Sequence, residues 1–237
     1  YAVPIVLDDT TNWENSGEEQ VFDLLDALGN NAMNSLLKAI NEDLLGAQSG
    51  KTMLGYQDII ADAGTGTVGG INSSTSTFWQ NQKYTTSKTF TTATVANVFD
   101  GLVAWNTIMD DCRKQGGRNN AIVTTYSIAA AYRTALASAG YGEVSTSNVT
   151  GINGPEFPGY MGAQVVADND CAALHSYMVD TEAIKLRVMK QANFKKTPFV
   201  SLQSNGQLAQ LAYMVAGVQL CTNNRRRSGV ATAITGL

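Results

Sequence analysis

The residues most suggestive of chemistry are the glycines of the segment GTGTVGG, residues 64–70. Gly64, Gly66 and Gly69 fit G-x-G-x-x-G, the spacing that lets a backbone turn approach the pyrophosphate of a dinucleotide. The apolar run DIIA, residues 58–61, precedes them as the strand of such a site should. This spacing raises a dinucleotide-binding enzyme as one hypothesis.

The sequence after the glycines argues against that hypothesis. The third glycine should open a helix, but residues 71–82, INSSTSTFWQNQ, are polar and lack helical periodicity. An acidic residue should follow within about 20 residues to bind the ribose, yet none lies between Gly64 and Phe99. The GKT at residues 50–52 lacks the earlier glycine of a P-loop. We therefore expect no bound cofactor and interpret residues 64–70 as a flexible turn.

The remaining candidates for catalysis or metal binding are few. His175 is the only histidine, which excludes multi-histidine zinc sites, and the sequence has no G-x-S-x-G elbow to supply a serine nucleophile. We interpret His175 as a packed or half-exposed residue at a strand edge rather than as a catalytic base. Cys112, Cys171 and Cys221 are widely spaced, which favours a reducing compartment over a disulfide framework. The sequence thus predicts neither an enzyme nor a metal site.

Composition indicates a folded protein with a substantial core. The chain has 237 residues, of which 44% are hydrophobic and 15% charged, and its net charge is −4. These values exclude an intrinsically disordered chain and a strongly basic nucleic-acid-binding domain. No apolar run approaches the roughly 20 residues that a bilayer-spanning helix needs. Because YAVPIVLDD at the start lacks the features of a signal peptide, we expect Tyr1 to be an internal point of a longer protein.

One long helix is predicted over residues 17–45. Ser16 and Glu19 form a capping box at its start, and Gly46 can close its end. An apolar stripe at three-to-four spacing runs along it: Val21, Leu25, Leu28, Ala32, Leu36, Ile40 and Leu44. The weak helix formers at residues 29–31 predict either a bend or a helix held by packing along its length.

The rest of the chain predicts a mixed α and β core. We expect helices over residues 94–114 and 127–140, with a buried strand over 121–126 between them. The segments after residue 140 indicate an antiparallel sheet, with strands expected at 161–168, 173–180, 183–189, 206–222 and 228–234.

Read in order, these segments resemble the major capsid proteins of tailed bacteriophages with the Hong Kong 97-type fold. Residues 15–46 are similar to the long spine helix of that family, and LGYQDIIAD (54–62) to the segment after it. Residues 67–82 resemble a block of glycines followed by aromatic residues. NFKKTPFV (193–200) and LCTNNRRRSGVATAI (220–234) resemble the C-terminal strands. Encapsulin compartment shells share the fold and are the close alternative.

The resemblance implies an α+β fold with a peripheral (P) domain, built on the spine helix and a long sheet, and a mixed α/β axial (A) domain. Residues 1–54 would begin the P domain with the end of an E-loop strand and the spine helix. Residues 55–190 would form the A domain, 191–225 would return to the P domain, and 226–237 would return to the A domain.

The function that the resemblance implies is structural. Copies would assemble into pentamers and hexamers of an icosahedral shell around double-stranded DNA, in the cytoplasm of a bacterial host and then in the virion. Partners would be other copies of the chain, with scaffold, portal and decoration proteins and non-specifically packaged DNA as further candidates, and no membrane.

Two small groups of residues are candidate assembly contacts. Arg225, Arg226 and Arg227 form either a solvated turn or a contact with carboxylates of a neighbouring subunit, and DNA contact is a third alternative. Phe78 and Trp79 lie in a polar loop, where they anchor either the local core or an interface.

Overall fold

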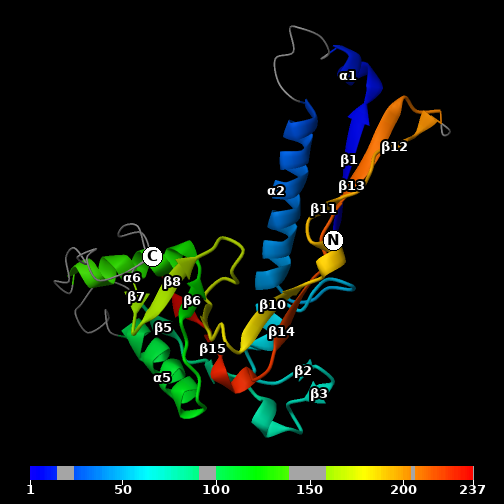
Figure 1. Ribbon diagram of the computed structural model, residues 1–237. Coiled ribbons are helices and arrows are strands. Elements are labelled where there is room, and N and C mark those ends of the chain that lie inside the picture. The colour runs from blue at the N-terminus through cyan, green and yellow to red at the C-terminus, as the bar shows by residue number, and fades with distance from the viewer. Residues whose placement is uncertain (15–23, 91–99, 139–158, 204–205, 237) are drawn as a thin grey trace. The chain divides into compact units, whose positions relative to one another are not determined.

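The computed structural model describes residues 1–14, 24–90, 100–138, 159–203 and 206–236 (Figure 1). The chain divides into two compact units. Unit 1 comprises residues 1–43 and 186–219, and unit 2 comprises residues 44–185 and 220–237.

Unit 1 consists of an antiparallel sheet and a long helix. Strand β1 (Ala2–Asp8) pairs along its whole length with β13 (Ala209–Val215), and β13 also pairs with β11 (Lys195–Lys196) and β12 (Val200–Ser201). A short helix, α1 (Asp9–Glu14), follows β1, and the long helix α2 (Leu24–Leu45) lies along the sheet (Figure 1).

The burial pattern of unit 1 follows from its sequence. In β1, Ile5 and Leu7 are buried while Val6 between them is exposed, as expected for a strand with one covered face. In α2, Ala32, Leu36 and Ile40 are buried at a spacing of four residues, which places them on one face of the helix. Buried apolar residues thus recur at every second position in β1 and at every fourth position in α2. These repeats define the two faces that form the core of unit 1.

The long helix matches its prediction where the structure describes it. Helix α2 begins at Leu24, and residues 17–23 of the predicted helix lie outside the described residues. Residues 29–31 remain within one continuous helix, so packing overrides their weak helix propensity.

Unit 2 contains a six-stranded sheet with the strand order β4, β15, β9, β6, β8, β7. Its strands are β4 (Gln82–Tyr84), β15 (Gly229–Ala231), β9 (Ser176–Val179), β6 (Ala121–Thr124), β8 (Ala163–Ala167) and β7 (Gly159–Tyr160). The pairs β6–β8 and β4–β15 are parallel. Strands after residue 140 pair antiparallel with one another in β7–β8 and β9–β15, as expected, but the sheet also takes in β4 and β6 from earlier in the chain through parallel pairs. The sheet is mixed because α6 (Tyr126–Ser138) lies in the connection from β6 to β8, and such a crossover returns the chain in the same direction.

Two apolar cores cover the two faces of this sheet. On β9, Met178 belongs to one core and Tyr177 and Val179 to the other, because successive side chains of a strand point to opposite faces. The first core includes Trp105 of α5 (Asp100–Lys114) and Tyr132 of α6, whose ring centroids are 5.1 Å apart. The second includes residues of the short helix α3 (Tyr56–Ile59).

The strand predicted over residues 206–222 is broken in two. Strand β13 ends at Val215 and β14 (Val218–Thr222) begins after Gly217. The Gly217 amide donates to the Ala192 carbonyl at 2.7 Å, and a Cβ on Gly217 would lie 3.1 Å from the Cβ of Met189. This close approach, which residue type alone does not reveal, redirects the chain. Strand β14 then pairs with β10 (Ile184–Val188).

The last predicted strand, residues 228–234, is also divided. Strand β15 is followed by β16 (Ile234–Thr235), which pairs in parallel with β5 (Lys88–Thr89). Ala233 between β15 and β16 has a φ of 59°, so the backbone turns there.

The unit boundaries differ by several residues from the predicted domain boundaries at 54/55, 190/191 and 225/226. The structure divides the chain after residues 43, 185 and 219. Leu45 at the end of α2 packs with Ile59 and Ile60, which places the helix end in unit 2. Arg225 is buried in unit 2, which accounts for the shift of the last boundary.

Candidate assembly surfaces

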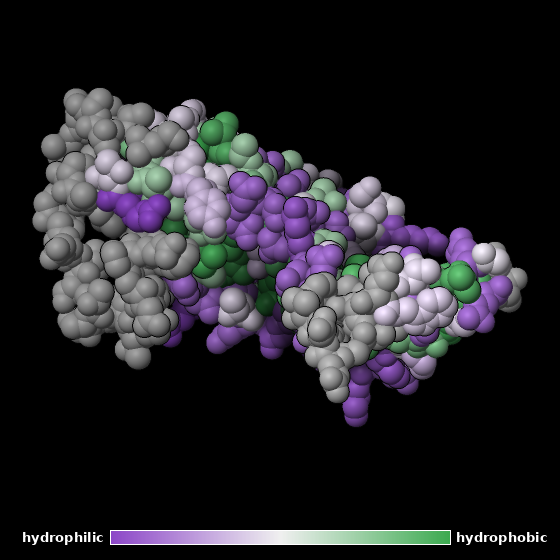
Figure 2. Space-filling view, turned by 90° about the horizontal axis from the view of Figure 1, so that it is seen from above, coloured by the Kyte–Doolittle hydropathy of each residue, from purple (hydrophilic) through white to green (hydrophobic). Residues whose placement is uncertain are grey.

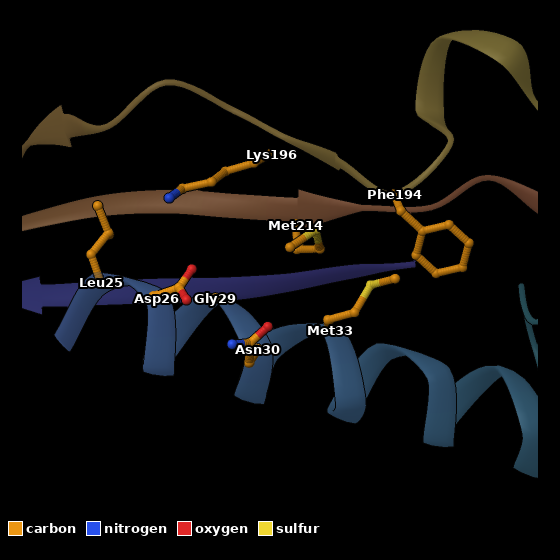
Figure 3. A pocket seen from close by; sticks show the side chains of 8 residues that line it. All are labelled: Leu25, Asp26, Gly29, Asn30, Met33, Phe194, Lys196 and Met214. Atoms are coloured by element: carbon orange, nitrogen blue, oxygen red, sulfur yellow. The ribbon is translucent and has the colours of Figure 1, made fainter. Parts of the chain in front are cut away.

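A groove in unit 1 lies between α2 and the strands β11 and β13 and encloses about 430 Å³. It is lined by Leu25, Asp26, Gly29, Asn30, Met33, Phe194, Lys196 and Met214. Figure 3 shows Phe194 and Met33 at one end, and Lys196 extending toward the end where Leu25 and Asp26 lie. The groove therefore has an apolar, methionine-containing end and a polar end.

Two backbone features shape this groove. A Cβ added to Gly29 would meet nothing within 4 Å, so the helix has open space at this position. Phe194 has a φ of 48°, a left-handed conformation that bulky residues rarely adopt. Such strain persists only where the surrounding structure fixes it, and here it holds an aromatic ring at the rim of the groove.

The three consecutive arginines have three different environments. Arg225 is fully buried, contrary to the expectation that it contacts a neighbouring subunit. Its Nε donates to the carbonyl of Ile59 at 2.7 Å, and its two Nη atoms reach the Asp58 carbonyl, Ser73 Oγ and Asn81 Oδ1 at 3.2–3.3 Å. Burial lowers the pKa of its guanidinium. Arg225 thus joins separate segments of its own chain through hydrogen bonds. No sequence pattern indicated this role.

Arg227 is also engaged within its own chain. Its Nε lies 2.8 Å from Oδ2 of the buried Asp180, and its Nη2 lies 3.0 Å from Oε2 of Glu182. The hydrogen bond with Glu182 is the main reason that the pKa of Arg227 is raised. Arg226 is half-buried on the same turn, and its amide donates to Asn224 Oδ1 at 3.1 Å. Of the three guanidinium groups, that of Arg226 remains the candidate for a contact outside the chain.

Phe78 and Trp79 are neighbours in a 3₁₀ turn (Thr77–Trp79) but differ in exposure. Trp79 is half-buried and its Nε1 donates to the Val68 carbonyl at 3.1 Å, so it anchors the local loop. The side chain of Phe78 is 60% exposed. Phe78 therefore stays a candidate assembly residue, while Trp79 has a local structural role.

The glycine segment is a hairpin rather than the strand-to-helix turn of a dinucleotide site. A short helix, α3, precedes it where a strand was expected, and the glycines are followed by two paired strands, β2 (Thr67–Val68) and β3 (Ile71–Asn72). Gly69 and Gly70 form the turn between them with φ of 62° and 78°. No helix begins at the third glycine, so the loop lacks the helix N-terminus that holds the pyrophosphate in such sites.

Of the other residues considered for chemistry, His175 has local partners. His175 Nε2 lies 2.9 Å from Asp62 Oδ2, and its Nδ1 contacts the Ala173 carbonyl. Lys51 follows the turn residue Gly50, which has a φ of 62°, and belongs to the segment after the end of α2. Within the described ranges, no three His, Cys, Asp or Glu side chains are placed to hold a metal ion.

Hydrophilic and hydrophobic residues intermingle on the face seen in Figure 2. None of the helices in the described parts of the chain combines the length and the apolar character needed to span a bilayer.

Comparison with known proteins identifies the fold. No protein-family model and no curated protein matches the sequence. Among solved structures, the capsid of cyanophage A-1(L) matches 99% of this chain and 76% of its own, with a TM-score of 0.68 and 16% sequence identity. The chain has the Hong Kong 97-type fold, and the fold implied by the sequence resemblance is confirmed.

Two further structures extend this result. An encapsulin from Synechococcus elongatus matches 99% of this chain and 73% of its own, with a TM-score of 0.63 and 8% identity. The capsid of an empty GTA particle matches with a TM-score of 0.61 and 13% identity, again over 99% of this chain and 73% of its own. The fold is therefore shared by shells of more than one kind.

Proposed function

We propose that this chain is a shell-forming structural protein and, more specifically, the major capsid protein of a tailed bacteriophage. The observation that carries this proposal is the agreement of the fold over 99% of the chain with the subunit of a phage capsid. In this proposal, unit 1 corresponds to the P domain and unit 2 to the A domain. Copies would form pentamers and hexamers of an icosahedral shell around double-stranded DNA.

The physical mechanism is the repetition of modest contacts. A contact between two different surfaces of adjacent copies closes into a ring or a shell when its rotation permits. Each contact can be weak, because every copy is held by several neighbours and the contacts act together. The assembled protein would reside in the bacterial cytoplasm and then in the virion, with scaffold, portal and decoration proteins as further partners.

A second candidate function is an encapsulin-like compartment shell. The match with the Synechococcus elongatus encapsulin covers as much of this chain as the match with the phage capsid. The two functions differ in content, since one shell encloses DNA and the other encloses protein.

Assembly and content are separable in experiment. The full-length protein is expressed and examined by velocity sedimentation and negative-stain microscopy, where closed shells or capsomers are expected. Particles purified from the natural source are then treated with nuclease. Protected double-stranded DNA supports the capsid, whereas a DNA-free shell with a second protein inside supports the compartment. A protein that remains monomeric at high concentration contradicts both.

A further inference from the structure

Charged residues are strongly segregated along this chain. Residues 1–37 contain no lysine or arginine, and their acidic residues are Asp8, Asp9, Glu14, Glu18, Glu19, Asp23 and Asp26. Residues 183–237 contain no aspartate or glutamate. Because the whole chain carries a net charge of only −4, this separation creates opposite local charges that the composition conceals.

Apart from Lys38 of α2, the basic residues of unit 1 lie on consecutive elements. Arg187 is on β10, Lys190 begins the 3₁₀ turn Lys190–Ala192, and Lys195 and Lys196 form β11. We name these four residues the basic edge. All four are exposed, and among the residues that the structure describes none of them forms an ion pair. Lys196 Nζ lies 4.7 Å from the ring centroid of Phe199, a contact that leaves its charge uncompensated.

The backbone of the basic edge is fixed. The Met189 amide donates to the Gly217 carbonyl at 2.8 Å, and the Gly217 amide donates to the Ala192 carbonyl at 2.7 Å. Lys195 and Lys196 are in register with Val215 and Met214 of β13. The four cations are therefore held on ordered backbone, which reduces the entropy lost when a partner binds.

Apolar side chains are interleaved with these cations. Leu186, Val188 and Met189 are exposed, and the side chain of Met189 is 61% exposed. Lys196 also lines the groove, together with the apolar Phe194. Surfaces that bind DNA are more polar and more uniformly charged than those that bind protein, so this mixture favours an acidic protein segment with apolar residues of its own.

We propose that the basic edge and the adjoining groove bind the acidic segment of residues 8–23 from a second copy of this chain. That segment combines carboxylates with apolar residues such as Trp13, which is exposed. Carboxylates would pair with the basic edge while apolar side chains enter the groove between Met33 and Phe194. The contact joins two different surfaces and is therefore of the head-to-tail kind that builds rings and shells. This inference rests on the proposed shell function.

The test reverses the charges on each side in turn. The variant Lys190→Glu/Lys195→Glu is expected to reduce the yield of shells on the order of tenfold or more, since opposed like charges disfavour the contact. Glu18→Lys/Glu19→Lys should have a similar effect. The quadruple variant, with both pairs reversed, restores complementarity and should recover assembly. Lys51→Glu/Arg133→Glu, which changes the same number of exposed charges in unit 2, is the matched control.

Circular dichroism and urea titration establish that each variant is folded before its assembly is measured by sedimentation and microscopy. Recovery in the quadruple variant supports the contact. If the wild type assembles and the Lys190/Lys195 variant assembles equally well, the contact is wrong and the shell function stands. If the wild type does not assemble, the shell function fails and the contact fails with it.

Two other results also overturn the contact. The first is that the Lys190/Lys195 variant loses both assembly and binding to double-stranded oligonucleotide, and that the quadruple variant does not recover assembly. That result would mean that the basic edge binds DNA. The second is irregular aggregation of a variant in which Lys190 and Lys195 are both replaced by uncharged Gln. That result would mean that these lysines protect an exposed sheet edge.

Discussion

Arg225 Nε donates a hydrogen bond of 2.7 Å to the carbonyl oxygen of Ile59, linking two residues far apart in the sequence. The same guanidinium reaches the Asp58 carbonyl, Ser73 Oγ and Asn81 Oδ1. One buried side chain thus ties the end of α3, the hairpin loop and the start of β4 to the C-terminal turn. Its contacts are to neutral acceptors, so the arrangement depends on the forked geometry of arginine rather than on pairing of opposite charges.

Replacement of Arg225 by lysine should destabilise unit 2 by about 2 kcal/mol or more, because a single ammonium cannot reach all four acceptors and leaves buried polar groups unsatisfied. The matched variant is Arg226→Lys, at a half-buried position on the same turn, where a change within about 0.5 kcal/mol is expected. Urea titration measures both. Equal stability of the two variants would show that the Arg225 hydrogen bonds contribute little.

Two helix glycines should respond oppositely to alanine. Gly29→Ala in α2 should stabilise the protein by about 0.5–1 kcal/mol, because alanine is the better helix former and nothing lies within 4 Å of the new Cβ. Gly101→Ala in α5 would place a Cβ 2.6 Å from the buried ring of Phe90 and should destabilise by about 1–3 kcal/mol. Thermal unfolding compares the two, and destabilisation by Gly29→Ala would contradict the open space beside the helix.

The three cysteines should differ sharply in reactivity toward a thiol reagent. Burial raises the pKa of both Cys112 and Cys171 to about 12, while Cys221 is exposed on β14. At pH 8 we expect labelling of Cys221 in the native protein and of all three thiols after denaturation, since the thiolate is the reactive form. Peptide mass spectrometry locates the label. Rapid native labelling of Cys112 would be inconsistent with its burial.

Stability should decline in alkali. The folded pKa of Cys112 and Cys171 lies near 12, above the model-compound value of 9.0. Below about pH 9 both thiols are protonated in both states. As pH rises from 9 toward 12 the unfolded chain loses these protons first, so the free energy of unfolding falls by up to about 1.4 kcal/mol per pH unit for each thiol.

Urea titrations at several pH values between 8 and 10 measure this decline. The variant Cys112→Ala should retain only part of the slope, because one of the two raised thiols is absent. A slope that is unchanged in this variant would mean that other groups cause the alkaline loss, and burial raises the pKa of Tyr132 and Tyr177 as well.

The spacing of apolar residues predicted the helices and strands whose sequence pattern lies within a single segment. Within the predicted stripe, Ala32, Leu36 and Ile40 are buried as expected, whereas Leu25 is exposed. Strand β6 and helix α6 follow one another in the predicted order. The break at Gly217 was missed because it depends on the approach of Ala192 and Met189 from another segment. Apolar periodicity reports which face of an element is covered, but it does not report which other strand covers it.

The candidate site was predicted less well for the same reason. A run of three arginines indicates a charged surface, yet the fold buries Arg225 and pairs Arg227 with Asp180 and Glu182. The groove between α2 and β11 could not be predicted, because its walls come from residues about 170 positions apart in sequence. The segregation of acidic and basic residues was readable from the sequence, and its meaning became apparent only once β10 and β11 were placed in unit 1.

Strand β1 pairs with β13 from Ala2 opposite Val215 to Asp8 opposite Ala209. This pairing also fixes the order in which parts of the protein can fold during synthesis. Strand β1 leaves the ribosome early and must wait for β13 before its sheet can form. Residues 44–185, by contrast, are contiguous and supply most of unit 2. The groove that we propose for contact between copies has Met214 of β13 in its wall, so it is complete only after residue 214 has been made.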